Sequence, residues 1–388
     1  KAMMGAQGGG VSLPLNIDFN TLEDGPLPAP LTGTTWTVSG GRAVNTPTAG
    51  ENVLTGGDME DDPVTYWPAT GTPATREKSD AQAHGGTYSL HLVTDGVNEG
   101  VSKNIAATPG RFYRFSSFLR RASGGQPRVR LTGNGLDAGS NYVSSADTWE
   151  LREASGMAGG TGVSLIVQSS GTAADWFVDD AELVELAFGS VVAPVSTSES
   201  SVTAEITIST LAPGTWTGWI TNIDDPDNPQ NFLVAALTYD SGTYRAQLWK
   251  VQDGTPARII TGNVTLGTAK KLKLVKNGTT CQLFYGGTQV GEDQIIAGLT
   301  STLHGPFATS EESAIGFVSL QATPFDEDTT AEPELLTTVA WISDPHTGAG
   351  VPYAAGTFAN FCAAVESYSP DALICTGDIA ERCYQDDY

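Results

Sequence analysis

Short runs in which apolar and polar residues alternate are the dominant pattern along this chain. Runs such as LNIDF (15–19), SLHLV (89–93), TAEITI (203–208) and YRAQLWKV (244–251) place apolar side chains at every second position. This is the period of a β-strand with one buried face. Turns rich in Gly, Asn and Asp separate the runs, and Asn277-Gly278 is a strong hairpin signal. The pattern predicts a mainly β protein built from sandwiches.

The predicted strands divide into a central block and two flanks. Residues 51–186 resemble a complete sandwich of roughly eight strands, which opens with a strand at 52–60 and closes with one at 175–183. A lone two-stranded unit is marginal in water, so the flanks 15–50 and 187–322 are interpreted as one discontinuous jelly roll. The block 51–186 is then an insertion in an early loop. The alternative is two sandwiches in tandem behind a free N-terminal hairpin.

The pattern changes after an acidic, proline-containing linker at 323–336. TTVAWI (337–342) and ALIC (372–375) are continuous apolar runs, which are typical of buried parallel strands. Residues 354–368 carry apolar side chains at helical spacing. We therefore expect a short C-terminal α/β (βαβ) segment over 337–388. The Gly-rich residues 1–14 lack periodicity and are expected to be an arm that orders only against a partner.

Composition narrows the classes of partner. Twenty basic and 44 acidic residues give a formal charge of −24, which disfavours nucleic acid because the chain repels phosphate backbones. No apolar run is long enough for a membrane span. The cysteines contain no CxxC pair, which disfavours zinc, and a Cys362–Cys383 disulfide stays open. The four cysteines are Cys281, Cys362, Cys375 and Cys383.

Two groups of motifs resemble known families. The flank pattern Asp-Phe…Trp-Thr-Val-Ser-Gly-Gly-Arg-Ala-Val (18–44) and KLKLVKNGTTCQLFYGGTQVG (271–291) are similar to strands of concanavalin-like (laminin-G-type) jelly rolls. In the central block NVLTGGDME, HGGTYSLHL, TWELREASG and DWFVDDAEL resemble, in that order, galactose-binding-like carbohydrate-binding modules of polysaccharide hydrolases. The resemblance implies two lectin-like β-sandwiches, one nested in the other, with a glycan as partner.

Such modules stack sugar faces on aromatic rings and bind hydroxyl groups with nearby polar side chains. Trp67, in a Tyr-Trp-Pro loop, is expected to be the most exposed ring, whereas Trp176 alternates with apolar neighbours and is expected in the core. The candidate sugar-binding residues are Trp67, Tyr113, Tyr142 and Trp149, with Arg128, Arg114 and Asn141 as polar partners.

The same resemblance implies a structural calcium ion in the central block. An acid of GDME (Glu60, or Asp58) and one of VDDAEL (Asp180, or Asp179) would meet where the first and last strands lie together. A weaker candidate is the loop NIDDPDNPQNF (222–232), where Asp224 and Asp227, with Asp225 and Asn231, could bind calcium. The alternatives are exposed carboxylates and an ordinary hairpin loop.

The C-terminal segment carries the sharpest motif. WISDPH places Asp344 and His346, and ICTGDIA places Asp378, just beyond the ends of predicted neighbouring strands. This resembles the opening of the calcineurin-like metallophosphoesterase family, which implies a divalent metal pair such as Mn, Fe or Zn. Of the family's usual second acid only Glu381 could serve, and its Gly-Asn-His motif and later histidines are absent. The sequence therefore predicts that the chain as given is not catalytic.

These features together predict a non-catalytic glycan-binding or adhesion protein. We expect it to be extracellular, at a cell surface or on a virion, such as a phage tail, with self-association through the N-terminal arm. One alternative is the N-terminal targeting part of a longer two-metal metallophosphoesterase. Another is a structural spacer in which neither sandwich binds sugar.

Overall fold

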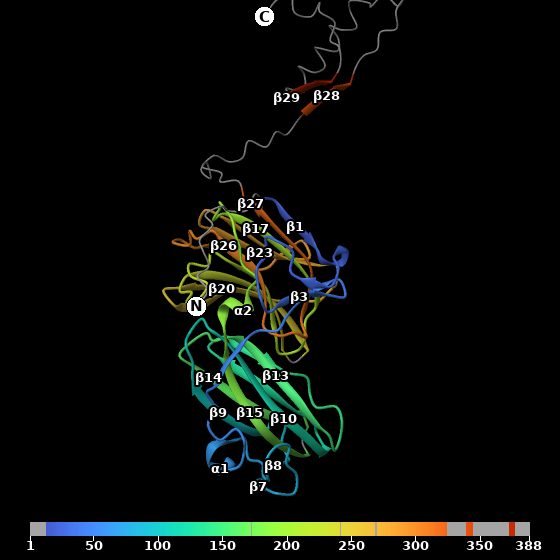
Figure 1. Cartoon of the computed structure of the whole chain (residues 1–388), viewed down its shortest axis with the longest axis vertical. Coiled ribbons are helices and arrows are strands. Elements are labelled where there is room, and N and C mark those ends of the chain that lie inside the picture. Colours follow the sequence, from blue (N-terminus) through green and yellow to red (C-terminus); the bar gives the residue numbers. More distant parts are fainter. Residues whose placement is uncertain are drawn as a thin grey trace, which may run out of the picture. The chain divides into compact units, whose positions relative to one another are not determined.

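A computed structural model describes residues 13–171, 173–240, 242–267, 270–323, 339–343 and 372–376. The chain divides into two compact units, which are Lys1–Phe325 and Asp326–Tyr388. The first unit consists of two β-sandwiches (Figure 1). The prediction of a mainly β protein is confirmed. The described helices are single turns: η1 (Phe19–Thr21), α1 (Pro63–Tyr66) and α2 (Phe188–Val191). None of the helices in the described residues is long and apolar enough to cross a membrane.

One sandwich, here the host sandwich, combines strands from both ends of this unit. Its larger sheet runs in the order β2 (Gly25–Pro26), β3 (Trp36–Ser39), β4 (Arg42–Asn45), β27 (Ala314–Ala322), β17 (Val202–Thr210), β22 (Lys271–Asn277), β23 (Thr280–Tyr285) and β24 (Thr288–Gln289), with β1 (Leu15–Asp18) beside β27 and β25 (Gln294–Ile295) beside β23. The facing sheet runs in the order β16 (Val195–Ser196), β26 (Leu303–Ala308), β18 (Trp216–Thr221), β19 (Phe232–Asp240), β20 (Thr243–Gln252) and β21 (Thr255–Val264).

The N-terminal strands are an integral part of the host sandwich. Strand β1 pairs antiparallel with β27, and the β3–β4 hairpin pairs with β27 through β4. The buried Asn45 side chain donates hydrogen bonds to the carbonyl oxygens of Ser190 (2.9 Å) and Ala308 (2.8 Å). The N-terminal hairpin is therefore not a free unit, and this is the pairing that a nested arrangement requires.

The other sandwich, here the inserted sandwich, contains the strands between β4 and β16. One sheet runs in the order β13 (Trp149–Met157), β10 (Phe112–Gly124), β15 (Ala174–Leu186), β8 (Ser89–Thr94) and β7 (Thr75–Ser79), with β5 (Ala49–Asn52) beside β15. The facing sheet runs in the order β12 (Leu136–Gly139), β11 (Pro127–Gly133), β14 (Gly162–Ser169), β9 (Gly100–Ala106) and β6 (Ala69–Thr70). Its eleven strands exceed the roughly eight that were predicted.

The prediction of an opening strand at 52–60 is wrong. Strand β5 ends at Asn52, and the chain then turns through two left-handed residues, Gly56 (φ 68°) and Met59 (φ 59°). Positive φ angles interrupt a strand, and the carbonyl of Gly56 is used to accept a hydrogen bond from Trp67 Nε1 at 3.1 Å. The predicted closing strand at 175–183 is correct, since it lies within β15.

The two sandwiches share one hydrophobic cluster at their junction. Phe112 of the inserted sandwich lies 5.6 Å from Phe307 of the host sandwich and 5.9 Å from Phe188, measured between ring centroids. The two connecting segments also lie side by side, because the N–H of Ala187 donates to the carbonyl of Thr48 at 2.9 Å. An apolar joint with two adjacent connections resists relative motion of the sandwiches.

In the second unit, β28 (Val339–Ser343) and β29 (Ala372–Thr376) pair in parallel, with Val339 opposite Ala372. Parallel neighbours need a crossover connection, as the predicted βαβ segment has. The predicted helix at 354–368 lies outside the described residues. So do the candidate metal ligands Asp344, His346 and Asp378, together with Cys362 and Cys383, residues 1–12 and most of the predicted linker.

Candidate functional site

A row of large side chains crosses the solvent-facing side of the β13-β10-β15-β8-β7 sheet. Strand register places one residue from each strand in line: Trp149, Arg120, Phe177, His91 and Glu77. With neighbouring strands about 4.8 Å apart, the row extends over about 19 Å. The opposite side of the same strands fills the core with residues such as Leu119 and Trp176. We refer to the solvent-facing side of this sheet as the outer face.

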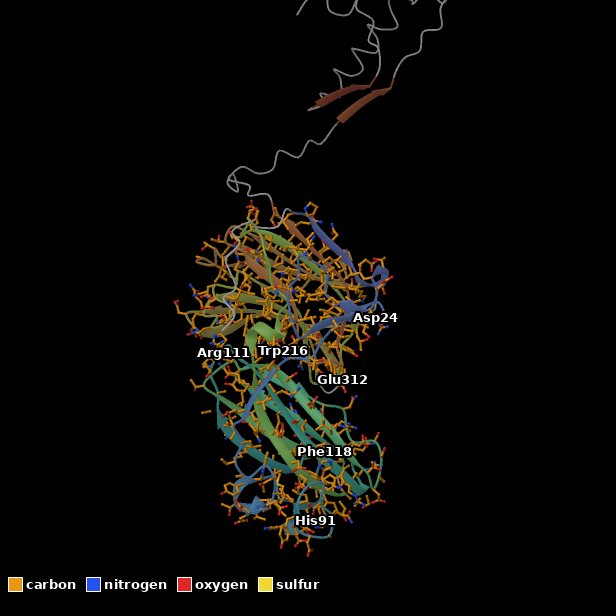
Figure 2. The ribbon with its side chains drawn as sticks, in the orientation of Figure 1. Asp24, His91, Arg111, Phe118, Trp216 and Glu312 are labelled. Carbon is orange, nitrogen blue, oxygen red and sulfur yellow. The ribbon has the colours of Figure 1, made fainter. Side chains whose placement is uncertain are left out.

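Two stacks of an imidazole on a phenyl ring lie on the outer face. The His84 ring stacks on Phe118 with centroids 3.5 Å apart and an interplanar angle of 13°. The His91 ring stacks on Phe177 at 4.5 Å and 16°. Trp149 meets the His84 ring edge-on at 5.9 Å. Figure 2 shows Phe118 and His91 on the inserted sandwich, away from the junction marked by Trp216. The outer face is therefore lined by rings.

The first stack depends on a tight turn that covers part of the sheet. The buried carboxylate of Asp179, opposite Phe118 in the register, accepts hydrogen bonds from the backbone N–H of His84 at 2.7 Å and of Gly85 at 3.2 Å. Burial raises the pKa of Asp179 to about 6, although these backbone hydrogen bonds act to lower it. Asp179 thus fixes the turn that places the His84 ring on Phe118.

Carboxylates and a guanidinium group surround the second stack. The His91 ring lies between two carboxylates, with Nδ1 3.1 Å from Glu77 Oε1 and Nε2 2.9 Å from Asp175 Oδ1. Arg120, whose guanidinium lies 5.9 Å from the Phe177 ring, pairs with Asp147 at 2.9 Å. Carboxylates accept hydrogen bonds and guanidinium groups donate them, so the rings are flanked by groups of both kinds.

Of the sequence-predicted sugar-binding residues, Trp149 lies in the row and is partly exposed. Trp67 is completely buried and packs against Phe115 at 6.2 Å, so its prediction as an exposed platform is wrong. Trp67 caps the C-terminal end of α1, and its indole N–H donates to the carbonyl of Gly56. Tyr113 is also buried, and its hydroxyl donates to Glu185 Oε2 at 3.0 Å. Trp176 is in the core, as predicted.

The remaining predicted residues lie elsewhere. The guanidinium of Arg128, a buried side chain on β11, lies 4.8 Å from the partly buried ring of Tyr142. Arg128 lies on the facing sheet, whereas Tyr142 lies in the loop between β12 and β13. Arg114 and Asn141 line a cleft at the junction of the two sandwiches.

The predicted calcium ligands both contact the turn that carries His84. Glu60 Oε1 accepts hydrogen bonds from the N–H groups of Thr87 (2.7 Å) and Tyr88 (2.8 Å), and these bonds lower the pKa of Glu60. Asp180 Oδ2 lies 2.7 Å from His84 Nδ1. The turn needs glycine, because a Cβ on Gly86 (φ 61°) would lie 2.2 Å from Glu60 Oε1.

Calcium takes six to eight oxygen ligands. Within the described residues no group of three or more His, Cys, Asp or Glu side chains is arranged to hold a metal ion. Side chains alone therefore do not form a calcium site at Glu60 and Asp180. Because backbone carbonyl oxygens also bind calcium, an ion at this turn stays a prediction.

The second predicted calcium loop is organised by hydrogen bonds of its own. Both carboxylate oxygens of Asp224 are occupied: Oδ1 accepts from the Gln230 N–H at 2.9 Å and Oδ2 from Asn231 Nδ2 at 2.9 Å. Burial acts to raise the pKa of Asp224, but these hydrogen bonds outweigh it and lower the pKa. Asp227 is exposed. The loop also reaches the inserted sandwich, because the Arg111 guanidinium donates to Asn228 Oδ1.

Most of the outer face escaped the sequence analysis. Phe118, Phe177 and Leu151 occupy positions that the alternation assigns to solvent, and an apolar residue at such a position is a signal that could have found them. His84 and His91 carried no signal, because their ring contacts are with residues far away in the sequence.

Comparisons with known proteins give structural neighbours only. Protein-family models and characterised proteins show no match to this chain. A family 61 carbohydrate-binding module solved in complex with β-1,4-galactotriose is similar over 35% of this chain and 99% of its own, with 20% identity and a TM-score of 0.31. The CBM22-1 xylan-binding domain of Xyn10C from Paenibacillus barcinonensis is similar over 36% and 98%, with 18% identity and a TM-score of 0.29. The CBM22-1-CBM22-2 tandem of the same protein is similar over 72% and 98%, with 12% identity and a TM-score of 0.32.

Proposed function

We propose that the outer face of the inserted sandwich binds a glycan. The observation that carries the proposal is the cross-strand row with its two ring stacks on the solvent side of a sheet. Phe177 is buried and Phe118 is partly buried, but the rings of Trp149, His84 and His91 stay at least partly exposed on this side. Exposed rings that are clustered and rimmed by polar groups mark binding surfaces. Sugar rings offer apolar C–H faces to aromatic rings and hydroxyl groups to carboxylates and guanidinium groups.

The charge of the outer face favours a neutral glycan. Four carboxylates of the outer face, those of Glu77, Asp147, Asp175 and Asp180, pair with His91, Arg120 and His84. The whole chain also has a formal charge of −24. Like charges repel, so a polymer of uronic acids or sulfated sugars would be disfavoured, whereas an uncharged polysaccharide would not.

The proposal extends to attachment as the role of the protein. A joint stiffened by one shared apolar cluster would present the outer face in a fixed direction, which suits adhesion at an extracellular surface, a cell surface or a virion. Self-association through residues 1–14 belongs to the same proposal. Size-exclusion chromatography with light scattering, comparing the full chain with a version that lacks residues 1–14, tests it. A monomer in both cases would contradict self-association.

Binding is tested with soluble β-1,4-galactan and xylan, the glycan types named for the structural neighbours, and with a polyuronate as the acidic comparison. If a sugar covers about 60 Å² of ring face, at about 25 cal/mol per Å² the contact contributes about 1.5 kcal/mol. Trp149→Ala should therefore raise Kd by roughly tenfold in calorimetric titrations. Phe118→Ala should also weaken binding, because it removes the ring on which the exposed His84 ring stacks.

Tyr66→Ala is the matched control, because Tyr66 is an aromatic ring 36% exposed on the same sandwich and packs near Lys103 of the other sheet. Its affinity should equal that of the wild type. Equal affinities in all three variants, with a glycan bound, would exclude the outer face. Absence of binding to any member of a broad glycan array would favour a structural spacer instead.

A second candidate function concerns the second unit. The parallel pairing of β28 and β29 supports an α/β segment of the kind that the phosphoesterase resemblance implies. The corresponding proposal is that the two sandwiches target a two-metal phosphoesterase. Phosphodiesterase assays with Mn²⁺, on the natural gene product and on its Asp344→Asn variant, test it, and equal activities would refute it.

A further inference from the structure

A polar cleft lies where the two sandwiches meet. Its volume is ≈ 220 Å³, and both sandwiches line it. The inserted sandwich contributes Arg114, Leu151 and Glu153, and the host sandwich contributes Thr215, Ser310 and Glu312. Pockets that enclose a drug-sized ligand usually hold about 300–1,000 Å³, so this cleft suits a single ring rather than a chain. Figure 2 shows Glu312 at the level of the junction.

The cleft is continuous with the outer face. Leu151, 45% exposed, lines the cleft and also lies opposite Phe118 in the strand register. Along β13 the side chains of Trp149, Leu151 and Glu153 follow one another on the same side of the sheet, about 6.8 Å apart. A ligand lying on Trp149 and Leu151 therefore points directly at the cleft.

Loops of the host sandwich close the far end of this path. The N–H of Ser155, the next residue on this side of β13, donates to the carbonyl of Gly214 at 2.7 Å. Its hydroxyl lies 2.7 Å from the Thr309 hydroxyl. These contacts join the strand directly to the loops, and Ser155 is buried. A glycan chain that lies along the strand therefore cannot continue beyond the cleft.

The groups in the cleft match the hydroxyl groups of an uncharged sugar. Arg114 Nε lies 3.5 Å from Glu153 Oε1, so a donor and an acceptor stand side by side. Burial raises the pKa of Glu153, Arg114 opposes this, and the carboxylates of Glu312, Glu311 and Glu182 act in the same direction as burial. Carboxylates outnumber guanidinium groups around Glu153, and an anionic sugar would be repelled.

We propose that this cleft is an end subsite of the glycan-binding face, which holds one uncharged terminal sugar of a glycan chain whose preceding residues lie along Leu151, Trp149 and the His84 ring that stacks on Phe118. The site is composite, because the host sandwich supplies the closing wall. The inference rests on the proposed function of the outer face, and it makes chain ends, rather than chain interiors, the preferred ligands.

The test uses the full chain and neutral β-1,4-linked oligosaccharides of three to four residues, compared with the same chains carrying a bulky group at either end. Glu312→Ala should weaken oligosaccharide binding by about five- to tenfold, because a charged hydrogen-bond acceptor is lost. Asn141→Trp, at an exposed position on the rim of the cleft, should weaken it further by filling the space. A bulky group at one of the two ends should have the same effect.

Glu311→Ala is the matched control, since it removes the same charge from the same exposed loop without lining the cleft. Its affinity should equal that of the wild type. If Glu312→Ala and Asn141→Trp also bind like the wild type while Trp149→Ala binds more weakly, the end subsite is refuted and the glycan face stands. If the wild type binds no glycan, the proposed function fails and this inference fails with it.

Discussion

Acidification should destabilise the host sandwich through one buried imidazole, that of His304 on β26. Its Nε2 lies 3.0 Å from the carbonyl oxygen of Glu199, so Nε2 carries the proton and donates. Its Nδ1 accepts from the Asn222 N–H at 3.3 Å and from the Thr221 hydroxyl. A second proton on Nδ1 would face the Asn222 N–H, and the Thr221 hydroxyl would have to accept instead of donate. Burial lowers the pKa of His304 from 6.5 to about 4, although the hydrogen bond to Glu199 acts the other way.

The free energy of unfolding that is lost on acidification follows from proton linkage. A group with a lowered folded-state pKa contributes stability that is present above its unfolded pKa of 6.5 and is lost as the pH falls through about 4. Between pH 7 and pH 4 this loss amounts to about 3 kcal/mol for His304.

Asp179 changes the pH dependence of the free energy of unfolding in the opposite direction to His304. Its folded-state pKa of about 6 lies above the ordinary value of 3.8, so it contributes stability at low pH that is lost as the pH rises through about 6. This contribution falls by about 2.5 kcal/mol between pH 4 and pH 7. The two effects nearly cancel in the wild type, so only a variant can separate them.

Urea unfolding of the wild type and of His304→Gln at pH 7, 5.5 and 4 measures the difference. The variant should be less stable than the wild type at pH 7, because packing and hydrogen bonds are lost. Its stability should then fall less between pH 7 and pH 4 than that of the wild type, by about 3 kcal/mol. Parallel pH dependences for the two proteins would show that His304 is not held neutral by the fold.

Other contacts give predictions of their own. Asn45→Ala should lower the free energy of unfolding by about 2–4 kcal/mol in urea titrations, because the buried carbonyls of Ser190 and Ala308 lose a donor; a change below 1 kcal/mol would contradict the role of Asn45. Gly86→Ala should lower both the melting temperature and the glycan affinity, because its Cβ would displace Glu60 and with it the turn; unchanged values would contradict this. Millimolar CaCl₂ should raise the melting temperature relative to EDTA if an ion binds at this turn, and identical melting curves would exclude it.

The candidate site was predictable only in part. Trp149 was found because an aromatic residue at the start of a strand in a carbohydrate-module motif is a local signal. Trp67 was misplaced because its neighbours in sequence indicate a loop, and its burial depends on Phe115 and Gly56, which only the fold brings to it. Tyr113 was misplaced for a similar reason, because Glu185 on the adjacent strand covers its hydroxyl.

The sequence by itself determined the mainly β class and the strands with clear alternation, such as β17, β22 and β23 with the turn at Asn277-Gly278. These follow from the side-chain period of two and from the turn chemistry of neighbouring residues, which are local properties. Only the tertiary structure decided that Trp149, Arg120 and His91 lie in one row and that host loops close the cleft beside it. Strand register and the docking of the two sandwiches depend on the packing of residues far apart in the chain, and a single sequence does not encode that packing in any local pattern.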